Sequence, residues 1–208
     1  MSRPVRKKAA RKTPAERSAE IADAARDVAL EHGLYGVTLR SIAAQIDVAP
    51  ALVAHYEPNM DTLVANTFGT IVATELVEVG ELVAERESPR ARLALLLETL
   101  LDGTRDDVTG IWVEAWALGR RNEPLAQRVR DEMDDWRAFL QGIIEAGVAS
   151  GEFETDDAAS VAWQVLGMID GLNAHALVRW EHSSDRGTRI GHAVEGMLGL
   201  HRGVLATP

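Results

Sequence analysis

The chain has 208 residues, of which 46% are hydrophobic and 26% are charged. This length suits one or two domains with a substantial core, and the composition excludes a disordered chain or a coiled rod. The absence of cysteine excludes disulfides, thiolate nucleophiles and cysteine metal sites. No apolar run has the length to span a bilayer, and no apolar signal segment follows the basic start. We therefore expect a cytoplasmic protein with no membrane partner.

The net charge of −10 is unevenly distributed along the sequence. Residues 1–56 carry nine Lys and Arg against six Asp and Glu, whereas residues 57–208 carry thirteen against twenty-six. Every charge in the first twelve residues is positive. We predict a disordered basic arm over residues 1–12, which is typical of a DNA-tracking tail, a membrane-surface tether or a solubilising end.

Beyond this arm, apolar residues recur at steps of three and four, and no alternating strand run occurs. This pattern predicts an all-α fold of about nine helices. Thr13, Pro14 and Glu16 form a capping box at the start of a first helix, which is expected to end at Gly33.

Shorter and longer helices follow in chain order. Thr38 is the expected N-cap of a short helix, and Pro50 is the expected first residue of the next one. Short connections between the later helices predict an antiparallel bundle. The predicted ranges after the first helix are 39–46, 50–56, 59–86, 90–103, 108–121, 124–149, 156–182 and 187–204.

The two short helices have the spacing of a helix-turn-helix, whose second helix lies in the major groove of DNA. Helix pairs of this kind also occur as ordinary packing, so the residue types must decide. Thr38, Arg40 and Ser41 are expected to face outward at the start of the first short helix. Amides, a hydroxyl and a guanidinium at a helix N-terminus favour an anion such as a phosphate.

Residues 14–64 resemble the DNA-binding domain of the tetracycline-repressor (TetR) family of bacterial regulators. The resemblance rests on residues at characteristic positions of the family: Gly33, Tyr35, Gly36, Thr38, Leu39, Arg40, Ile42, Ala43, Val48, His55, Tyr56, Asp61 and Leu63. Three positions depart from it. Glu57 replaces a Phe, Met60 replaces a phosphate-contacting Lys, and Ala54 replaces an aromatic residue of the recognition helix.

The resemblance implies a helix-turn-helix domain over residues 13–58, with the start of the fourth helix at 59–64, and a ligand-binding and dimerisation domain over 65–208. The recognition helix lacks the Arg, Lys, Asn and Gln that read guanine or adenine, which predicts apolar contacts to thymine methyls and readout of groove shape. The expected DNA-binding residues are Lys12, Thr38, Arg40, Ser41, Ala49, Pro50, Ala51, Ala54, His55 and Tyr56.

All five tryptophans lie in the second domain, where the resemblance implies a cavity for a small-molecule effector. Apolar stripes at helical spacing form either core or pocket wall. Asp170, Asn173 and His175 are the main polar interruptions, which favours an apolar or aromatic ligand with one polar handle. The candidate ligand-binding residues are Trp112, Trp116, Met133, Trp136, Leu140, Val165, Met168 and Leu172.

A dimer is expected because one helix-turn-helix covers only a few base pairs. Glycines in the last two helices indicate close packing, either within the monomer or against a partner. The candidate interface residues are Gly167, Gly171, Ile190, Val194, Met197 and Leu198.

These observations predict a DNA-binding regulator, most simply a repressor that binds a palindromic operator as a homodimer and is released by its effector. One alternative is a ligand-binding or protein-interaction module whose DNA-binding head is degenerate at Glu57 and Met60. Another is an all-α enzyme, but the chain has no Glu-x-x-His pair, P-loop or Gly-x-Ser-x-Gly pattern, and its histidines lack metal-ligand spacing. We expect no catalytic residue, no metal and no cofactor.

Overall fold

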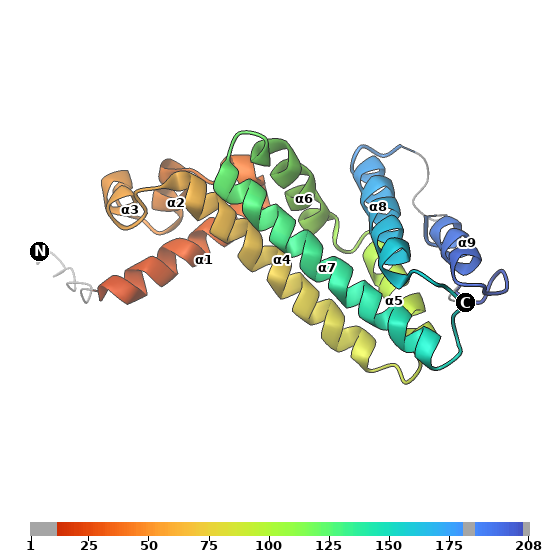
Figure 1. Cartoon of the computed structure of the whole chain (residues 1–208). Helices are drawn as coiled ribbons and strands as arrows, with labels where there is room; N and C mark the ends of the chain where they lie inside the picture. Colours follow the sequence, from red (N-terminus) through yellow and green to blue (C-terminus); the bar gives the residue numbers. More distant parts are fainter. Residues whose placement is uncertain (1–11, 181–185, 206–208) are drawn as a thin grey trace, which may run out of the picture.

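The computed structural model describes residues 12–180 and 186–205, and within these ranges the chain forms nine α-helices and no strand. The all-α prediction is therefore confirmed over the described residues. Figure 1 shows an elongated molecule in which a small N-terminal head lies at one end of a larger helical body. Residues 1–11, where we predict the basic arm, lie outside the described residues.

The head consists of three helices and one short turn, as the helix-turn-helix pattern predicts. They are α1 (Pro14–His32), η1 (Leu34–Gly36), α2 (Leu39–Gln45) and α3 (Pro50–Tyr56). The sequence did not predict η1, a 3-10 turn between α1 and α2.

Local capping and a small shared core fix the head. In the predicted capping box, Thr13 Oγ1 accepts from the Glu16 N–H at 3.2 Å, and Glu16 Oε2 accepts from the Thr13 N–H at 2.7 Å. Ile21 of α1, Ile42 of α2 and Val53 of α3 each have 0% exposure and belong to one apolar cluster. The three helices are therefore held in one arrangement by side chains that each of them contributes.

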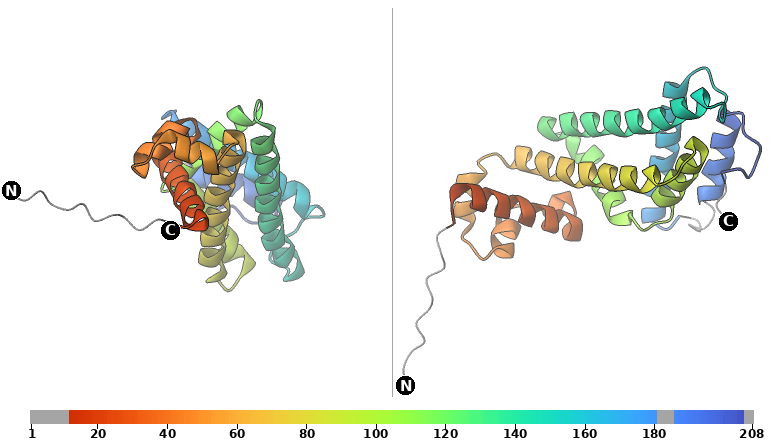
Figure 2. Two further views of the ribbon diagram at one scale, coloured as in Figure 1. Left: turned by 90° about the vertical axis from the view of Figure 1, so that its left-hand side faces the viewer. Right: turned by 90° about the horizontal axis from the view of Figure 1, so that it is seen from below.

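The body contains six helices, and its first helix also reaches the head. They are α4 (Met60–Ala84), α5 (Pro89–Leu101), α6 (Asp106–Gly119), α7 (Glu123–Ala149), α8 (Ala158–Leu177) and α9 (Arg186–Met197). α4 and α7 lie side by side and run away from the head in the same direction (Figure 2). Asn122 Nδ2 donates to the Asp61 carbonyl at 3.3 Å, which ties the starts of these two helices together.

Contrary to the expectation from sequence, α4 has the length and apolar composition of a membrane-spanning helix. Half of its most apolar 18-residue window is buried inside the protein. Phe68 and Val72 are completely buried in the core that α4 shares with its neighbours. Packing within the bundle accounts for the apolar composition of this helix.

α8 and α9 begin or end at positions that differ from the predicted ones. Asp157 accepts from the Ser160 N–H at 2.9 Å and caps α8, so this helix begins after the predicted residue 156. Gly199 and Gly203 have φ angles of 65° and 88°, a left-handed conformation that glycine adopts without strain. α9 therefore ends at Met197, and the predicted continuation to residue 204 is wrong.

Candidate DNA-binding surface and ligand cavity

The start of α2 presents Arg40 to solvent. Thr38 is the N-cap and is exposed, and its Oγ1 accepts from the Ser41 N–H at 3.1 Å. Within the described part of the chain, no hydrogen bond or ion pair involves the Arg40 guanidinium, so it is available to a phosphate or a base. Thr38 and Arg40 thus lie where the sequence places them.

Ser41 has a different environment from the predicted one. Its side chain is half-buried, and its Oγ donates to the Gly36 carbonyl at 2.6 Å while accepting from the Thr38 N–H at 2.9 Å. The hydroxyl closes a capping box and anchors the preceding turn, so its prediction as an outward-facing phosphate contact is wrong. A capping box usually has Glu or Gln at the position of Ser41. The sequence analysis therefore did not predict this capping role.

The recognition helix α3 offers a small and mainly apolar surface. His55 is exposed, and its ring meets the half-buried ring of Tyr56 edge to face at a centroid distance of 5.2 Å. Tyr56 also packs against the head core, which fixes the orientation of this aromatic pair. The other predicted contact residues are exposed or half-buried, namely Ala49, Pro50, Ala51 and Ala54.

Lys12 lies at the base of α1 and forms an ion pair with Glu20, which also pairs with Arg17 at 2.5 Å. The hydrogen bond from Lys12 lowers the pKa of the Glu20 carboxyl. Exposed ion pairs contribute little to stability because water and salt screen them. The ion pair of Lys12 therefore holds its side chain only weakly.

A cavity of about 280 Å³ lies in the body among α4, α6, α7 and α8. Trp112, Trp116, Met133 and Trp136, four of the eight predicted ligand residues, line it, and Trp163 lines it as well. The Trp112 and Trp116 ring centroids are 5.8 Å apart with a tilt of 36° between the planes. These residues give the cavity a mainly aromatic wall.

Besides the exposed Asp134, two less exposed carboxyl groups line this cavity, Glu75 of α4 and Asp170 of α8. Burial raises the pKa of Glu75 to about 7, although the Arg105 guanidinium, at 3.7 Å, acts in the opposite direction. Burial alone raises the pKa of Asp170 to about 6. Both carboxyls therefore titrate near neutral pH. The sequence reasoning named Asp170 but missed Glu75, which is one of three glutamates in the second half of α4 and the one that is buried.

The other four predicted ligand residues do not line the cavity. Leu140 and Val165 have 0% exposure and belong to the core, and Met168 and Leu172 pack against that core. Residues at helical spacing share a face, but the cavity extends along only part of each face. The predicted stripe on α7 therefore begins as cavity wall at Met133 and Trp136 and continues as core at Leu140, whereas the predicted stripe on α8 packs only against the core.

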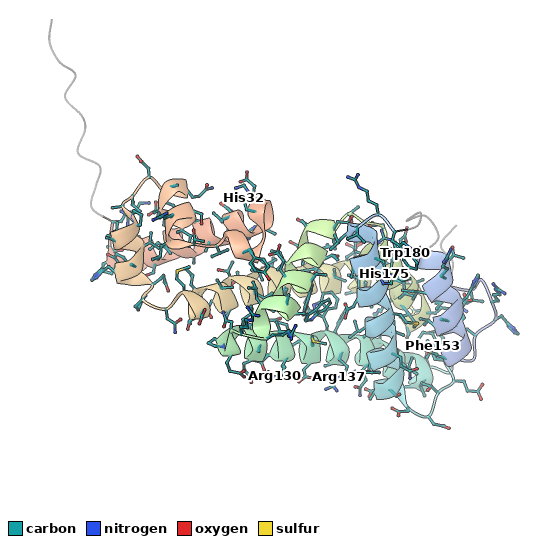
Figure 3. All side chains as sticks on the ribbon, turned by 90° about the horizontal axis from the view of Figure 1, so that it is seen from above. His32, Arg130, Arg137, Phe153, His175 and Trp180 are labelled. Atoms are coloured by element: carbon teal, nitrogen blue, oxygen red, sulfur yellow. The ribbon has the colours of Figure 1, made fainter. Side chains whose placement is uncertain are left out.

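Of the two other predicted polar interruptions, only Asn173 lies at the cavity. Its Nδ2 donates to the Leu100 carbonyl at 2.7 Å, and its Oδ1 accepts from Arg186 at 3.0 Å. His175 is exposed near the end of α8, where its ring meets Trp180 edge to face at 4.9 Å (Figure 3). Asn173 thus connects three helices, and His175 lies outside the cavity.

One helix connects the cavity to the head. Trp112 and Trp116 of α6 line the cavity, while Glu114 of the same helix accepts a hydrogen bond from the Tyr35 N–H at 3.4 Å. A side chain at Gly33, whose φ is 76°, would collide with the Glu114 carboxylate. Gly33, the C-cap of α1, and the second half of α6 are therefore in close contact, a link the sequence analysis missed.

The predicted dimer residues fall into two groups. Ile190, Val194 and Leu198 are at most 2% exposed in the chain's own core, so their prediction as contacts to a second copy is wrong. Met197 is half-buried. A Cβ at Gly167 or Gly171 would meet no atom within 4 Å, so no neighbouring helix of the same chain packs closely on these glycines. The apolar positions of α9 were assigned to the wrong face because their spacing does not distinguish an internal core from an interface.

A helix-turn-helix head, joined by one long helix to a body that encloses an aromatic cavity, defines a ligand-responsive DNA-binding transcriptional regulator. Residues 21–67 match the bacterial regulatory proteins of the tetR family, and residues 89–198 match the family described as BetI-type transcriptional repressor, C-terminal. The chain belongs to the TetR family of transcriptional regulators. The relatives it matches are regulators, not enzymes.

Similar proteins share this architecture at low sequence identity. The fatty acid metabolism regulator protein of Bacillus subtilis is 25% identical over 152 residues, which cover 73% of this chain and 78% of the relative. A crystal structure of a transcriptional regulator from Saccharomonospora viridis in complex with choline has a TM-score of 0.77 and 20% identity, covering 88% of this chain and 98% of that one. The regulator FadR from Bacillus subtilis in complex with stearoyl-CoA has a TM-score of 0.66 and 21% identity, covering 88% and 99%.

Proposed function

We propose that this protein is a cytoplasmic repressor that binds a palindromic operator as a homodimer and is released when a small apolar or aromatic effector fills the body cavity. The observation that carries the proposal is the position of α6. This helix supplies Trp112 and Trp116 to the cavity and Glu114 to the head. An effector that moves α6 therefore acts on the head through direct contacts.

A second contact supports transmission through α4. Phe68 of α4 is completely buried and meets the edge of Trp112 at a centroid distance of 5.0 Å. α4 continues from this point to the helix-turn-helix, so displacement of Trp112 displaces the helix that carries the head. A coupling free energy of about 1 to 3 kcal/mol changes DNA affinity about 5- to 150-fold.

In the proposed complex the head binds DNA through few polar groups. Arg40 and His55 read bases or phosphates, the exposed alanines of α3 contact thymine methyls, and Thr38 and Lys12 contact the backbone. Of the three departures from the family pattern, the one at Met60 removes a phosphate contact, because the family has a lysine at this position. The basic arm at residues 1–12 replaces it.

The proposed dimer uses the outer face of α8. Gly171 leaves room for a close helix approach, and Val178, which is 77% exposed, lies seven residues further along the same helix face, whereas Gly167 and Trp163 line the cavity. Apolar side chains beside bare glycines favour helix packing against a second copy. Two heads then lie on one duplex, separated by a multiple of about 34 Å.

The ligand complexes of the structural neighbours support a small-molecule effector. One of those proteins is described with choline and another with stearoyl-CoA. Because ligands this different occupy proteins of the same fold, the fold does not define the ligand. The residues that line the cavity of this chain must do so.

Selection of genomic DNA fragments by the purified protein tests the proposal. We expect enrichment of a palindromic sequence and, by sedimentation velocity, a dimer at micromolar concentration. A double variant, Arg40→Ala with His55→Ala, is the control and is expected to enrich nothing. A wild-type protein that enriches no sequence, or that sediments as a monomer, would contradict the proposal.

A further inference from the structure

The cavity carries an excess of acidic over basic groups. Three carboxyls line it, from Glu75, Asp134 and Asp170, against two guanidinium groups, from Arg105 and Arg137. With all five ionised, the lining has one uncompensated negative charge. Asp134 and Arg137 are exposed to water, whereas Glu75 is buried and Asp170 is half-buried. An unpaired carboxylate held partly out of water favours a ligand of the opposite sign, because transfer of an unpaired charge out of water is costly.

Both guanidinium groups already have carboxylate partners. Arg137 pairs with Asp134 at 3.0 Å, and Arg105 lies 3.7 Å from Glu75 and 3.3 Å from Glu78. In the part of the chain that the structure describes, no ion pair or hydrogen bond involves the Asp170 carboxylate. The uncompensated charge of the cavity is therefore located at Asp170, which is half-buried and lines the cavity.

The rest of the wall suits a cation that is poorly hydrated. Trp112, Trp116, Trp136 and Trp163 contribute indole rings to one space of about 280 Å³. The face of an indole ring attracts a positive group more strongly than that of any other side chain, particularly when the group has left water. A quaternary or bulky ammonium group satisfies both the rings and the carboxylate, whereas a metal ion would find too few oxygen ligands.

We propose that the effector of this cavity is an organic cation, whose positive group lies against the tryptophan rings and is neutralised by Asp170, with Glu75 as a second acidic group. This inference rests on the proposed function, because it names the ligand class of the same cavity. It also specifies the polar group of the ligand that the sequence leads us to expect. That group is positively charged and is attached to an apolar part of the ligand.

Proton release should accompany binding of the cation. Burial disfavours the charged forms, so the pKa of Glu75 is about 7 and that of Asp170 about 6, and a bound cation favours ionisation of both. The affinity therefore rises as pH increases from about 5 to about 8. Other charged groups also influence the ionisation of the two carboxyls. Arg105, Glu78 and Asp107 act on Glu75. Arg137 and Asp134 line the same cavity as Asp170.

Matched pairs of ligands provide the test. Choline and phenyltrimethylammonium each have an uncharged carbon isostere, neohexyl alcohol and tert-butylbenzene, with nearly the same shape. We would measure binding by isothermal titration calorimetry and by quenching of tryptophan fluorescence on the full-length protein. We expect at least one cation to bind about tenfold or more tightly than its isostere, a difference of about 1.4 kcal/mol. Calorimetry in buffers of different ionisation enthalpy should show proton release on binding.

The variant Asp170→Asn keeps the shape of the side chain and removes its charge, so it should abolish the preference for the cation while retaining binding of the isostere. Asp135→Asn, an exposed carboxyl on α7 that does not line the cavity, is the matched control and should behave as wild type. Equal affinity for a cation and its isostere would overturn the inference and leave the cavity as an effector site. Binding of neither member of a pair would also overturn it, and the DNA selection described above would then decide the proposed function separately.

Discussion

The head and the body of this protein differ in how their charged groups are arranged. The head keeps its proposed DNA-binding groups on the surface, where Arg40 of α2 and His55 of α3 are exposed. The body places Glu75 and Asp170 inside, where burial raises their pKa values to about 7 and about 6. A surface cation attracts the phosphate backbone over a distance, whereas a buried carboxyl selects a ligand that can replace water around it. In the proposed function, the exposed cations of the head attract DNA, and the buried carboxyls of the body select the effector.

The largest expected effect comes from removing the basic arm, which changes the head and leaves the body intact. Deletion of residues 1–12 removes six positive charges from each subunit. We expect DNA affinity to fall by on the order of a hundredfold at low salt, and the slope of log affinity against log salt to flatten by one or more units. Fluorescence anisotropy across a salt series measures both. An unchanged slope would remove the arm from the mechanism.

The next effect concerns the body alone and follows from the pKa of Glu75. This carboxyl has a pKa of about 7 in the folded protein against 4.5 as its ordinary value, so the unfolded chain releases the proton first. The free energy of unfolding therefore falls as pH rises from about 4.5 to about 7, by about 3 kcal/mol. Glu75→Gln should flatten this dependence and stabilise the protein at pH 8. Urea unfolding at several pH values measures it, and a variant that is less stable than wild type at pH 8 would contradict the assignment.

A substitution in the head should affect DNA recognition without affecting the cavity. Arg40→Ala is expected to cost about 1 to 3 kcal/mol of DNA binding, concentrated at one base position of the operator. Ligand affinity should not change. Anisotropy with a set of operators that differ at single positions measures this, and an equal loss on every sequence would mean that Arg40 contacts only phosphate.

The smallest effect should be on the connection between the two regions. Glu114→Ala removes the hydrogen bond to the Tyr35 N–H while leaving Trp112 and Trp116 in place. DNA affinity and ligand affinity should each stay within about threefold of wild type, and their coupling should fall below about 1 kcal/mol. Glu98→Ala, an exposed carboxylate on α5, provides the control. Full coupling in the Glu114 variant would exclude this contact as the connection.

The head was more predictable from sequence than the body, for a physical reason. Thr13, Gly33 and Pro50 act on the backbone within a few residues of their own positions, so each marks a helix boundary without knowledge of the tertiary packing. Which side chains surround a void depends instead on how three or four helices pack. Trp112 and Leu140 look alike in an apolar stripe, yet one lines the cavity and the other fills the core.

The errors at functional positions have the same origin. Ser41 and Ile190 were assigned outward-facing roles because helical spacing identifies a face but not what that face contacts. Glu75 and Glu114 were missed because their importance comes from partners distant in the sequence, Arg105 and Tyr35. Only the folded chain shows that Glu75 meets Arg105 at the cavity and that Glu114 meets Tyr35 at the head.

The most direct test of this account measures DNA affinity with the cavity filled. Anisotropy of a labelled operator, obtained from the genomic selection, would be recorded with increasing concentrations of whichever cation quenches the tryptophan fluorescence. We predict that DNA affinity falls about 5- to 150-fold as the cavity saturates, and that the midpoint of release follows the midpoint of quenching. Unchanged DNA affinity at saturating cation would contradict the claim that the body controls the head.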